Sequence, residues 1–203
     1  MIDVLLSLIG GYLAGSVPVA LPVARAHGFD PRRVGDRNPG FWNVKERLGW
    51  RPALPVFAGD LLKGTAAGLI GLALGGWRTG DLGVAAGASV APVYAAVAGA
   101  MAGHAWPVFA GFRGGRSILT FAGGVAVICP PAFALAVLAL VVVSLATRSF
   151  AVGARVGVFA VPVFQALFTP LPQVAATGAL MGLIGLRFAQ AALAARRRRE
   201  PAG

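Results

Sequence analysis

The sequence predicts an all-α, polytopic integral membrane protein. Hydrophobic residues make up 57% of its 203 residues and charged residues only 12%, whereas a soluble domain is about half apolar and about a quarter charged. The mean hydropathy is +0.77. The apolar residues fall in successive runs, and a helix needs about 20 of them to cross a bilayer. Because backbone polar groups inside a bilayer must bond to one another, helices are the expected spanning elements.

About seven spans are expected, joined by short links within a single domain that covers residues 1–203. They occupy residues 2–24, 53–75, 84–110, 117–130, 131–147, 154–170 and 171–190. Pro130 and Pro131 interrupt helical hydrogen bonding between the fourth and fifth spans. Pro170 and Pro172 do the same between the sixth and seventh. Five longer, tilted spans are the alternative, but that arrangement would place both breaks inside helices.

Basic residues are distributed asymmetrically about these spans. With seven spans, one side receives Arg25, Arg32, Arg33, Arg37, Lys45, Arg47, Arg51, Arg113, Arg116, Arg148, Arg155, Arg187 and Arg196 to Arg199. The other side receives Arg78 beside Asp81 and almost no other basic charge. Cytoplasmic loops carry an excess of lysine and arginine, so the N-terminus is expected outside and the basic tail 191–203 in the cytoplasm. The net charge of +11 then reflects topology and attraction to anionic lipids or substrates, and not nucleic acid binding.

Small residues recur at helical spacing inside two of the predicted spans. Gly10, Gly11 and Gly15 follow this pattern in the first span, and Gly64, Gly68 and Gly71 follow it in the second. Such spacing lets helix backbones approach closely. The sequence therefore predicts tight helix–helix packing along these faces.

The long loop 25–51 is a candidate anion site. It combines Asn38, Gly40 and Asn43 with several arginines. Glycines let backbone amides turn toward an anion, and the planar guanidinium matches phosphate. A solvated basic loop that merely fixes topology explains the same composition equally well.

A second candidate is the turn before the fourth span. Arg113, Gly114, Gly115 and Arg116 lead directly into an apolar helix. Backbone amides at a helix N-terminus, with two arginines nearby, form a natural phosphate cradle. A short turn of this composition is a weak signal when it is taken alone.

Four polar residues lie within or at the ends of predicted spans. His104 could act as a base or orient a hydroxyl group, although an interfacial, hydrogen-bonded histidine is the commoner case. Ser16 adds a polar group to the first span. Asp60 and Lys63 are three residues apart and share one helical face, which favours a structural ion pair. A hydrophobic groove between helices could hold an acyl chain, and no metal-ligand spacing is present.

Five short motifs follow one another in a distinctive order. They are Gly15-Ser16-Val17-Pro18; Val34-Gly35 leading to Asn38-Pro39-Gly40 and Asn43-Val44; Asp60-Leu61-Leu62-Lys63-Gly64; Gly103-His104-Ala105-Trp106-Pro107-Val108-Phe109; and Gly111-Phe112-Arg113-Gly114-Gly115-Arg116. This combination resembles the bacterial acyl-phosphate:glycerol-3-phosphate acyltransferases, the PlsY family. The similarity is carried by motifs in roughly the first 125 residues and mainly by hydropathy beyond them.

The resemblance implies a seven-span enzyme of the bacterial inner membrane with its site facing the cytoplasm. It would transfer an acyl group from acyl phosphate to the 1-hydroxyl of glycerol 3-phosphate, giving lysophosphatidic acid and phosphate for phospholipid biosynthesis. Its partners would be these two substrates and membrane lipids, and no cofactor or metal is expected. The expected catalytic residues are His104, Ser16 and Asn43. The expected substrate-binding residues are Asn38, Gly40, Arg113, Gly114, Gly115, Arg116, Thr120 and Arg148.

Several positions depart from the family's pattern. Asp36 stands where the family has serine, and Glu46 stands where it has arginine. Arg116 replaces a lysine, Ala151 replaces a serine and Arg187 replaces a histidine. A side chain lost from a catalytic constellation can cost orders of magnitude in rate. A catalytically impaired relative that acts as a lipid-binding, regulatory or transport protein is therefore the alternative function.

Overall fold

The computed structural model describes residues 1–75 and 89–197, and the regular elements within these residues are all helices. In chain order they are α1 (Ile2–Gly15), α2 (Ala20–Ala26), α3 (Phe41–Leu48), α4 (Trp50–Leu74), α5 (Val90–Ala105), the short 3-10 helix η2 (Val108–Ala110), α6 (Ile118–Ile128), α7 (Pro130–Thr147), α8 (Phe150–Gln165) and α9 (Leu171–Arg197). The all-α prediction is confirmed for these residues. Arg78 and Asp81, which entered the charge argument, lie outside the described residues, as do Arg198 and Arg199.

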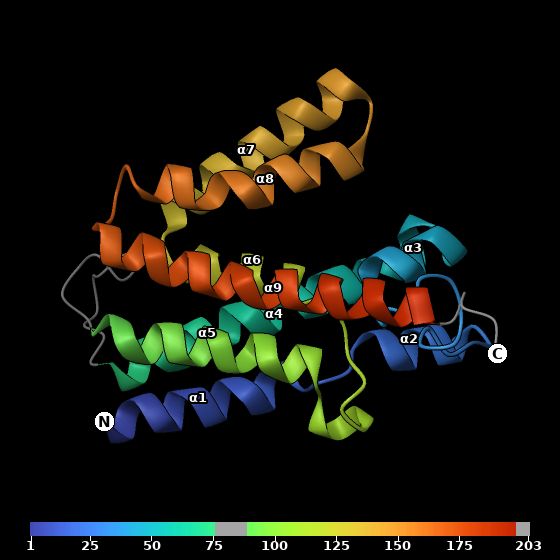
Figure 1. Cartoon of the computed structure of the whole chain (residues 1–203), viewed down its shortest axis with the longest axis horizontal. Helices are drawn as coiled ribbons and strands as arrows, with labels where there is room; N and C mark the ends of the chain where they lie inside the picture. The colour runs from blue at the N-terminus through green and yellow to red at the C-terminus, as the bar shows by residue number, and fades with distance from the viewer. Residues whose placement is uncertain (76–88, 198–203) are drawn as a thin grey trace.

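Most helices run roughly side by side along the long axis of the molecule (Figure 1). Five segments are long and apolar enough to cross a membrane, namely Ile2–Ala26, Trp50–Leu74, Val90–Ala110, Pro130–Thr147 and Leu171–Arg197. The shorter apolar helices α6 and α8 occupy the fourth and sixth predicted spans. With 11 residues, α6 is about 16 Å long, roughly half of a bilayer's hydrocarbon core. The number of seven crossings therefore stays a prediction.

The first predicted span is not one continuous helix. α1 ends at Gly15 and α2 begins at Ala20. Pro18 explains the break, because it lacks an amide hydrogen and disfavours the helical conformation of the residue before it. The carbonyl of that preceding residue, Val17, accepts a hydrogen bond of 3.3 Å from Nζ of Lys63 on α4. The break therefore brings polar main chain against a buried lysine.

The breaks predicted between later spans are confirmed. Cys129 separates α6 from α7, which begins at Pro130. Pro170 directly precedes α9. A further break, inside the third predicted span, follows Ala105, because Pro107 ends α5 before η2.

Glycines line the contact between α1 and α5, which pack against each other along their length. A Cβ at Gly11 or Gly15 would overlap with backbone carbonyls of α5. Reciprocally, a Cβ at Gly99 or Gly103 would overlap with carbonyls of α1. The two backbones therefore touch directly, as the spacing of Gly11 and Gly15 predicted.

This packing makes Gly103→Ala destabilising. The added Cβ would overlap with the carbonyl of Tyr12, and overpacking of this kind costs about 1–3 kcal/mol of unfolding free energy. Gly178 on α9 is the matched control, because nothing lies within 4 Å of a Cβ there. We expect Gly178→Ala to change stability by less than about 0.5 kcal/mol. Thermal unfolding of both variants in detergent measures the difference, and equal melting temperatures would contradict the proposed contact.

The helices bury a compact apolar core and also present large apolar side chains outward. The core is centred on Val93, Val97, Met101, Phe121 and Val125. The outward-facing residues include Leu138, Val142, Phe159 and Val163 on α7 and α8. Soluble monomers rarely expose contiguous apolar surface of this kind, whereas a helix facing lipid does so without cost.

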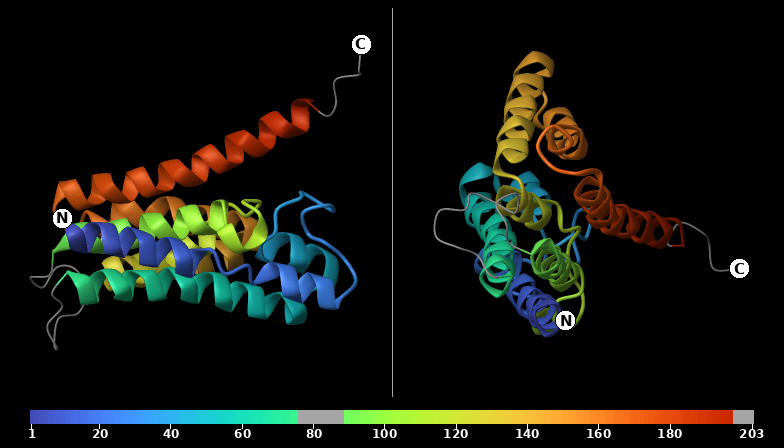
Figure 2. Two further views of the ribbon diagram at one scale, coloured as in Figure 1. Left: turned by 90° about the horizontal axis from the view of Figure 1, so that it is seen from below. Right: turned by 90° about the vertical axis from the view of Figure 1, so that its left-hand side faces the viewer.

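α7 and α8 form a hairpin that stands apart from the other helices along much of its length (Figures 1 and 2). At one end, Gln165 Nε2 donates a hydrogen bond of 3.0 Å to the hydroxyl of Tyr94 on α5. At the other end, Phe150 stacks on Trp42 of α3 with ring centroids 6.0 Å apart. Its ring also lies edge-on to the ring of Trp50, with ring centroids 5.3 Å apart. The hairpin is thus anchored at its two ends.

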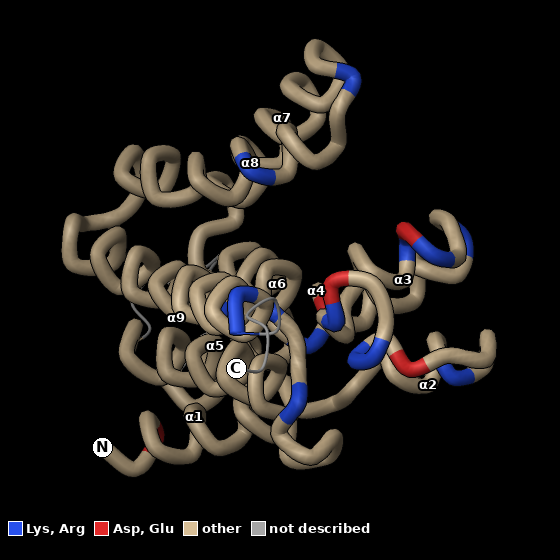
Figure 3. The backbone as a smooth tube through the Cα atoms, turned by 45° about the vertical axis from the view of Figure 1, so that its right-hand side comes forward, with Lys and Arg blue, Asp and Glu red and all other residues tan. Residues whose placement is uncertain are grey.

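Lysine and arginine gather at one end of the bundle. Figure 3 shows them around α2, α3 and the neighbouring ends of α4 and α9, and again on the α7–α8 hairpin, while the middles of most helices carry none. Buried charge is found mainly in one place, on α4, where it faces the C-terminal end of α5. That place is the candidate active site.

Candidate active site

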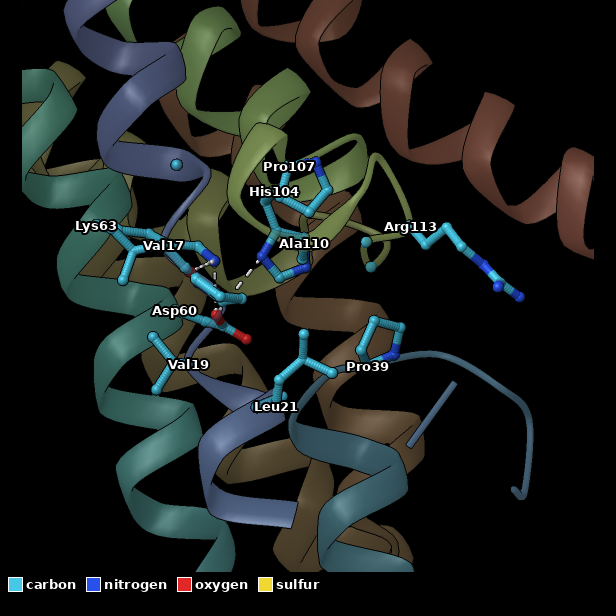
Figure 4. Close-up of a pocket in the computed structure, with 15 residues that line it drawn as sticks. Val17, Val19, Leu21, Pro39, Asp60, Lys63, His104, Pro107, Ala110 and Arg113 are labelled. Carbon is cyan, nitrogen blue, oxygen red and sulfur yellow. Dashed lines mark hydrogen bonds and ion pairs between the residues drawn. The ribbon is translucent and has the colours of Figure 1, made fainter. Parts of the chain in front are cut away.

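Three ionisable side chains meet where α4 faces the end of α5 (Figure 4). Lys63 Nζ lies 2.8 Å from Asp60 Oδ1, and both side chains are less than a tenth exposed. His104 Nδ1 lies 3.5 Å from the same carboxylate oxygen, close enough for an ion pair if the ring is protonated. This contact lacks the geometry of a hydrogen bond. Asp60 therefore faces two potential cations, and the predicted pair with Lys63 is confirmed.

The turn that follows η2 does not present its glycine amides to a ligand. The amide of Gly114 donates to the carbonyl of Ala105 at 3.2 Å, and the amide of Gly115 donates to the carbonyl of His104 at 2.9 Å. These bonds satisfy carbonyls at the C-terminal end of α5. Both amides are therefore engaged within the protein, and a role of Gly114 and Gly115 in substrate binding stays a prediction.

Arg187 of α9 holds the same turn from the opposite side. Its Nη2 donates to the carbonyl of Gly114 and its Nε donates to the carbonyl of Gly115, each at 3.0 Å. Its guanidinium also lies over the ring of Trp106, with 5.1 Å to the centroid. The sequence marked Arg187 as a lost histidine. The structure instead shows an arginine that fixes the turn immediately before Arg116.

Asn43 organises the loop 27–40 from inside the protein. Its side chain is almost fully buried, and Nδ2 donates to the carbonyls of Pro31, Val34 and Asn38 at 2.8, 3.0 and 3.2 Å. Because this amide donates to three backbone carbonyls, it holds the loop in one conformation. Asn43 therefore fixes the loop through Nδ2, and its catalytic role stays a prediction.

An ion pair fastens the same loop to η2. Asp30 and Arg32 approach to 2.7 Å, and Arg32 Nη1 donates to the carbonyl of Ala110 at 3.3 Å. The hydrogen bonds from Arg32 lower the pKa of Asp30 to about 2. The carboxylate is thus ionised at every pH at which the protein would be studied, and the pair is lost only as the pH falls toward 2.

Arg116 stands at the edge of the site and pairs with the loop. Its Nη1 lies 2.9 Å from Asp36 Oδ2. Its guanidinium also covers the ring of Phe188 on α9, with 4.6 Å to the centroid. Arg116 is therefore oriented by an anion on one side and an aromatic ring on the other.

A cavity of about 230 Å³ joins these polar groups to an apolar groove. Its polar end is formed by Asn38, Asp60, His104 and Arg116. Its walls come from α3, α4, α6, α7 and α8, and include Phe41, Phe57, Leu119, Phe133, Val137, Leu140, Phe150 and Val158. One end of the cavity thus suits an anion and the remainder suits a hydrocarbon chain.

Among the predicted site residues, the structure brings Asn38, Gly40, His104 and Arg116 to this cavity. Asn43 does not line the cavity. Asn38 connects the two, because its carbonyl accepts from Asn43 while its side chain approaches the turn at Gly115.

Four other predicted residues lie away from the cavity. The Ser16 hydroxyl is buried and donates to the carbonyl of Tyr12 at 2.7 Å. Thr120 is fully buried in α6, with its main-chain carbonyl against Gly64 of α4. Arg113 is exposed and lines a separate, smaller pocket beside Asp60 and His104, with its side chain directed away from them (Figure 4). Arg148 is exposed at the end of α7.

Glu46, the acidic residue that departs from the family's pattern, does not line the cavity. Its Oε1 accepts a hydrogen bond of 2.6 Å from Trp42 Nε1 on the exposed side of α3. Direct repulsion of a bound phosphate by this side chain is therefore not expected.

These features define a multi-pass membrane protein in which a largely apolar cavity ends at the side chains of Asn38, Asp60, His104 and Arg116. The family model for glycerol-3-phosphate acyltransferase matches residues 5–197. The chain therefore belongs to the glycerol-3-phosphate acyltransferase family, as its motifs predicted.

A crystal structure of PlsY, an integral membrane glycerol 3-phosphate acyltransferase, in its glycerol 3-phosphate form, has the same fold. The TM-score is 0.76 at 25% identity, and the match covers 98% of this chain and 95% of that chain. The lysophosphatidic acid form matches with a TM-score of 0.73 at 24% identity, over 97% of this chain and 93% of that one, and supports the fold. The integral membrane architecture is thus confirmed over nearly the whole length.

Curated relatives match over a shorter stretch. Glycerol-3-phosphate acyltransferase 1 of Deinococcus radiodurans is 49% identical over 71 residues, which are 35% of this chain and 36% of that protein. A glycerol-3-phosphate acyltransferase of Thermus thermophilus is 48% identical over 69 residues, or 34% of this chain and 35% of that protein. The aligned stretch thus spans about a third of these relatives' length.

Proposed function

We propose that the protein transfers an acyl group from acyl phosphate to the 1-hydroxyl of glycerol 3-phosphate, giving lysophosphatidic acid and inorganic phosphate. The cavity is the observation that carries this proposal. Both substrates are anionic and one is also a long hydrocarbon, and the cavity offers Arg116 and His104 at one end and apolar walls beyond them. Family membership supports the same chemistry.

The reaction needs positioning and charge stabilisation more than a metal or cofactor. The hydroxyl oxygen attacks the carbonyl carbon, the bond from that carbon to the phosphate oxygen breaks, and phosphate leaves with the bonding electron pair. The hydroxyl proton passes to the leaving phosphate or to His104. Arg116 would stabilise the negative charge that develops on the phosphate. The groove would hold the acyl chain so that both reactants meet in one orientation.

His104 is suited to contact the acceptor hydroxyl. Asp60 faces Nδ1, which favours the tautomer that leaves Nε2 free to accept a hydrogen bond. A Cβ at Gly115 would overlap with Nε2 and would lie 3.2 Å from Asn38 Oδ1. Glycine therefore keeps open the small space between these two acceptors.

Gly115→Ala should block this space. We expect kcat to fall about 100-fold, because displacing reacting groups by about 1 Å has effects of this size. Gly178→Ala, which adds the same methyl group in open space, should leave kcat unchanged. Turnover assays on both variants, each checked for folding by its melting temperature, test the idea. A fully active Gly115→Ala protein would show that His104 Nε2 does not take part in the reaction.

We also propose the orientation and location that the basic residues indicate, namely a bacterial inner membrane protein with its N-terminus outside and its active site toward the cytoplasm. Most of the described lysines and arginines gather at the end of the bundle around α2, α3 and the neighbouring ends of α4 and α9 (Figure 3), and such residues accumulate on the cytoplasmic side. The whole chain would act as one domain.

The direct test is an assay of the purified protein in nanodiscs. Acyl phosphate and glycerol 3-phosphate are supplied together, and phosphate release and lysophosphatidic acid are measured in the same sample. Equal amounts of the two products support the proposal. Acyl-coenzyme A replaces acyl phosphate in a parallel sample and should give no product.

One observation favours a second candidate, a relative that holds a lipid through its hydrocarbon chain without turnover. Arg116 already carries an anionic partner in Asp36, which opposes binding of a substrate phosphate, while the apolar walls of the cavity still suit a hydrocarbon chain. Saturable binding of lysophosphatidic acid, with no binding of glycerol 3-phosphate and no product formation, would favour this candidate over the enzyme.

A further inference from the structure

Asp36 uses both carboxylate oxygens at the rim of the cavity. Oδ2 lies 2.9 Å from Arg116 Nη1, and Oδ1 accepts a hydrogen bond of 3.1 Å from the amide of Asn38. Arg116 and Asn38 both line the cavity. The carboxylate therefore sits beside the cavity mouth, on a guanidinium that an anionic ligand would use.

Other cations close to the cavity are held more firmly. Lys63 is buried against Asp60, and Arg187 donates to two carbonyls. The Asp36–Arg116 pair differs because its side chains are 30% and 21% exposed. Water can solvate a released carboxylate at this position, so the pair can be exchanged for an external anion at low cost.

We propose that Asp36 is an intramolecular competitor for Arg116, which weakens binding of phosphate groups at this site and assists release of inorganic phosphate after acyl transfer. Phosphate and carboxylate both match the planar guanidinium fork. Each bound phosphate must therefore displace Asp36, and each departing phosphate is replaced by it. The inference deepens the proposed function and rests on it for the part that concerns product release.

The first test measures binding of inorganic phosphate by titration calorimetry, which needs no turnover. Removing a competing, partly exposed ion pair should tighten binding about three- to tenfold in Asp36→Asn. Asp30→Asn is the matched control, because it removes the same charge from the same loop, where Asp30 pairs with Arg32 instead. We expect this control to change the affinity less than twofold.

A double-mutant comparison locates the effect. In an Arg116→Gln background, Asp36→Asn should no longer tighten phosphate binding, because there is no guanidinium to compete for. Persistent tightening in that background would show a general charge effect and overturn the proposal. Weaker binding in the single variant would show that Asp36 positions Arg116, which also overturns it.

The second test measures product inhibition during acyl transfer. The inhibition constant for inorganic phosphate should fall about three- to tenfold in Asp36→Asn, matching the binding result. If the wild type has no turnover but the calorimetry behaves as expected, the proposed function fails and the competition stands. If turnover is normal and neither constant changes, the function stands and the competition fails.

Discussion

Asp60→Asn should lower the free energy of unfolding by about 3–5 kcal/mol, because it leaves a buried lysine without its charged partner. Lys63 and Asp60 are 2.8 Å apart with side chains 7% and 3% exposed, so water cannot replace the carboxylate. The same substitution removes the anion that faces His104. Denaturant-induced unfolding in detergent measures the loss.

Two further variants identify the cause. The double substitution of Asp60→Asn with Lys63→Met removes both charges and should recover most of the stability, since replacing a whole buried pair is often neutral. Asp3 is an exposed acid in α1, and Asp3→Asn should change stability by less than about 0.5 kcal/mol. If the single substitution at Asp60 were as mild as the one at Asp3, the buried pair would have no structural importance.

Arg116→Ala should reduce kcat/KM about 100- to 1,000-fold, the range found when one charge-stabilising donor is removed from an active site. Arg116 is a cation at the polar end of the cavity, and Phe188 holds its guanidinium in place. Arg116→Lys keeps the charge and loses the planar fork, so it should retain more activity than the alanine variant. Phosphate release and lysophosphatidic acid formation are measured together.

The control is an arginine of the same loop region that does not reach the cavity. Arg33 is exposed, and Arg33→Ala should leave kcat/KM within about twofold of the wild type, because exposed charges interact weakly through water. Similar losses in Arg33→Ala and Arg116→Ala would indicate a diffuse electrostatic effect. That result would contradict a specific role for Arg116.

The sequence predicted the helical architecture well because its signals are local. Hydrophobic runs mark the spans, and Pro130 and Pro170 mark two of the helix boundaries. The break in the first span was missed, although Pro18 was visible, because the surrounding residues remain apolar. The helix α3 was missed as well, since its eight residues lie inside a charged loop.

The site was predicted in part, because its roles depend on contacts distant in sequence. His104 and Arg116 were identified from their own chemistry, and both line the cavity. The internal hydrogen bonds of the Gly114 and Gly115 amides were not predicted, since nothing near them in sequence shows that α5 supplies acceptors. Arg187 was marked only as a departure from the family's pattern, and its contacts were not predicted because its partners lie 72 and 73 residues away.

The glycine contact between α1 and α5 has a mechanical consequence. Backbones that touch directly leave no side chains between them to repack, so the two helices should move as one rigid body. The polar breaks that follow them, at Pro18 and Pro107, would then keep a constant separation throughout a catalytic cycle. We expect an opening that admits a lipid tail to come from the α7–α8 hairpin, between its two anchored ends, because the hairpin forms part of the cavity wall. Spectroscopic labels on that hairpin should report motion, while a pair of labels spanning α1 and α5 should report an unchanged distance.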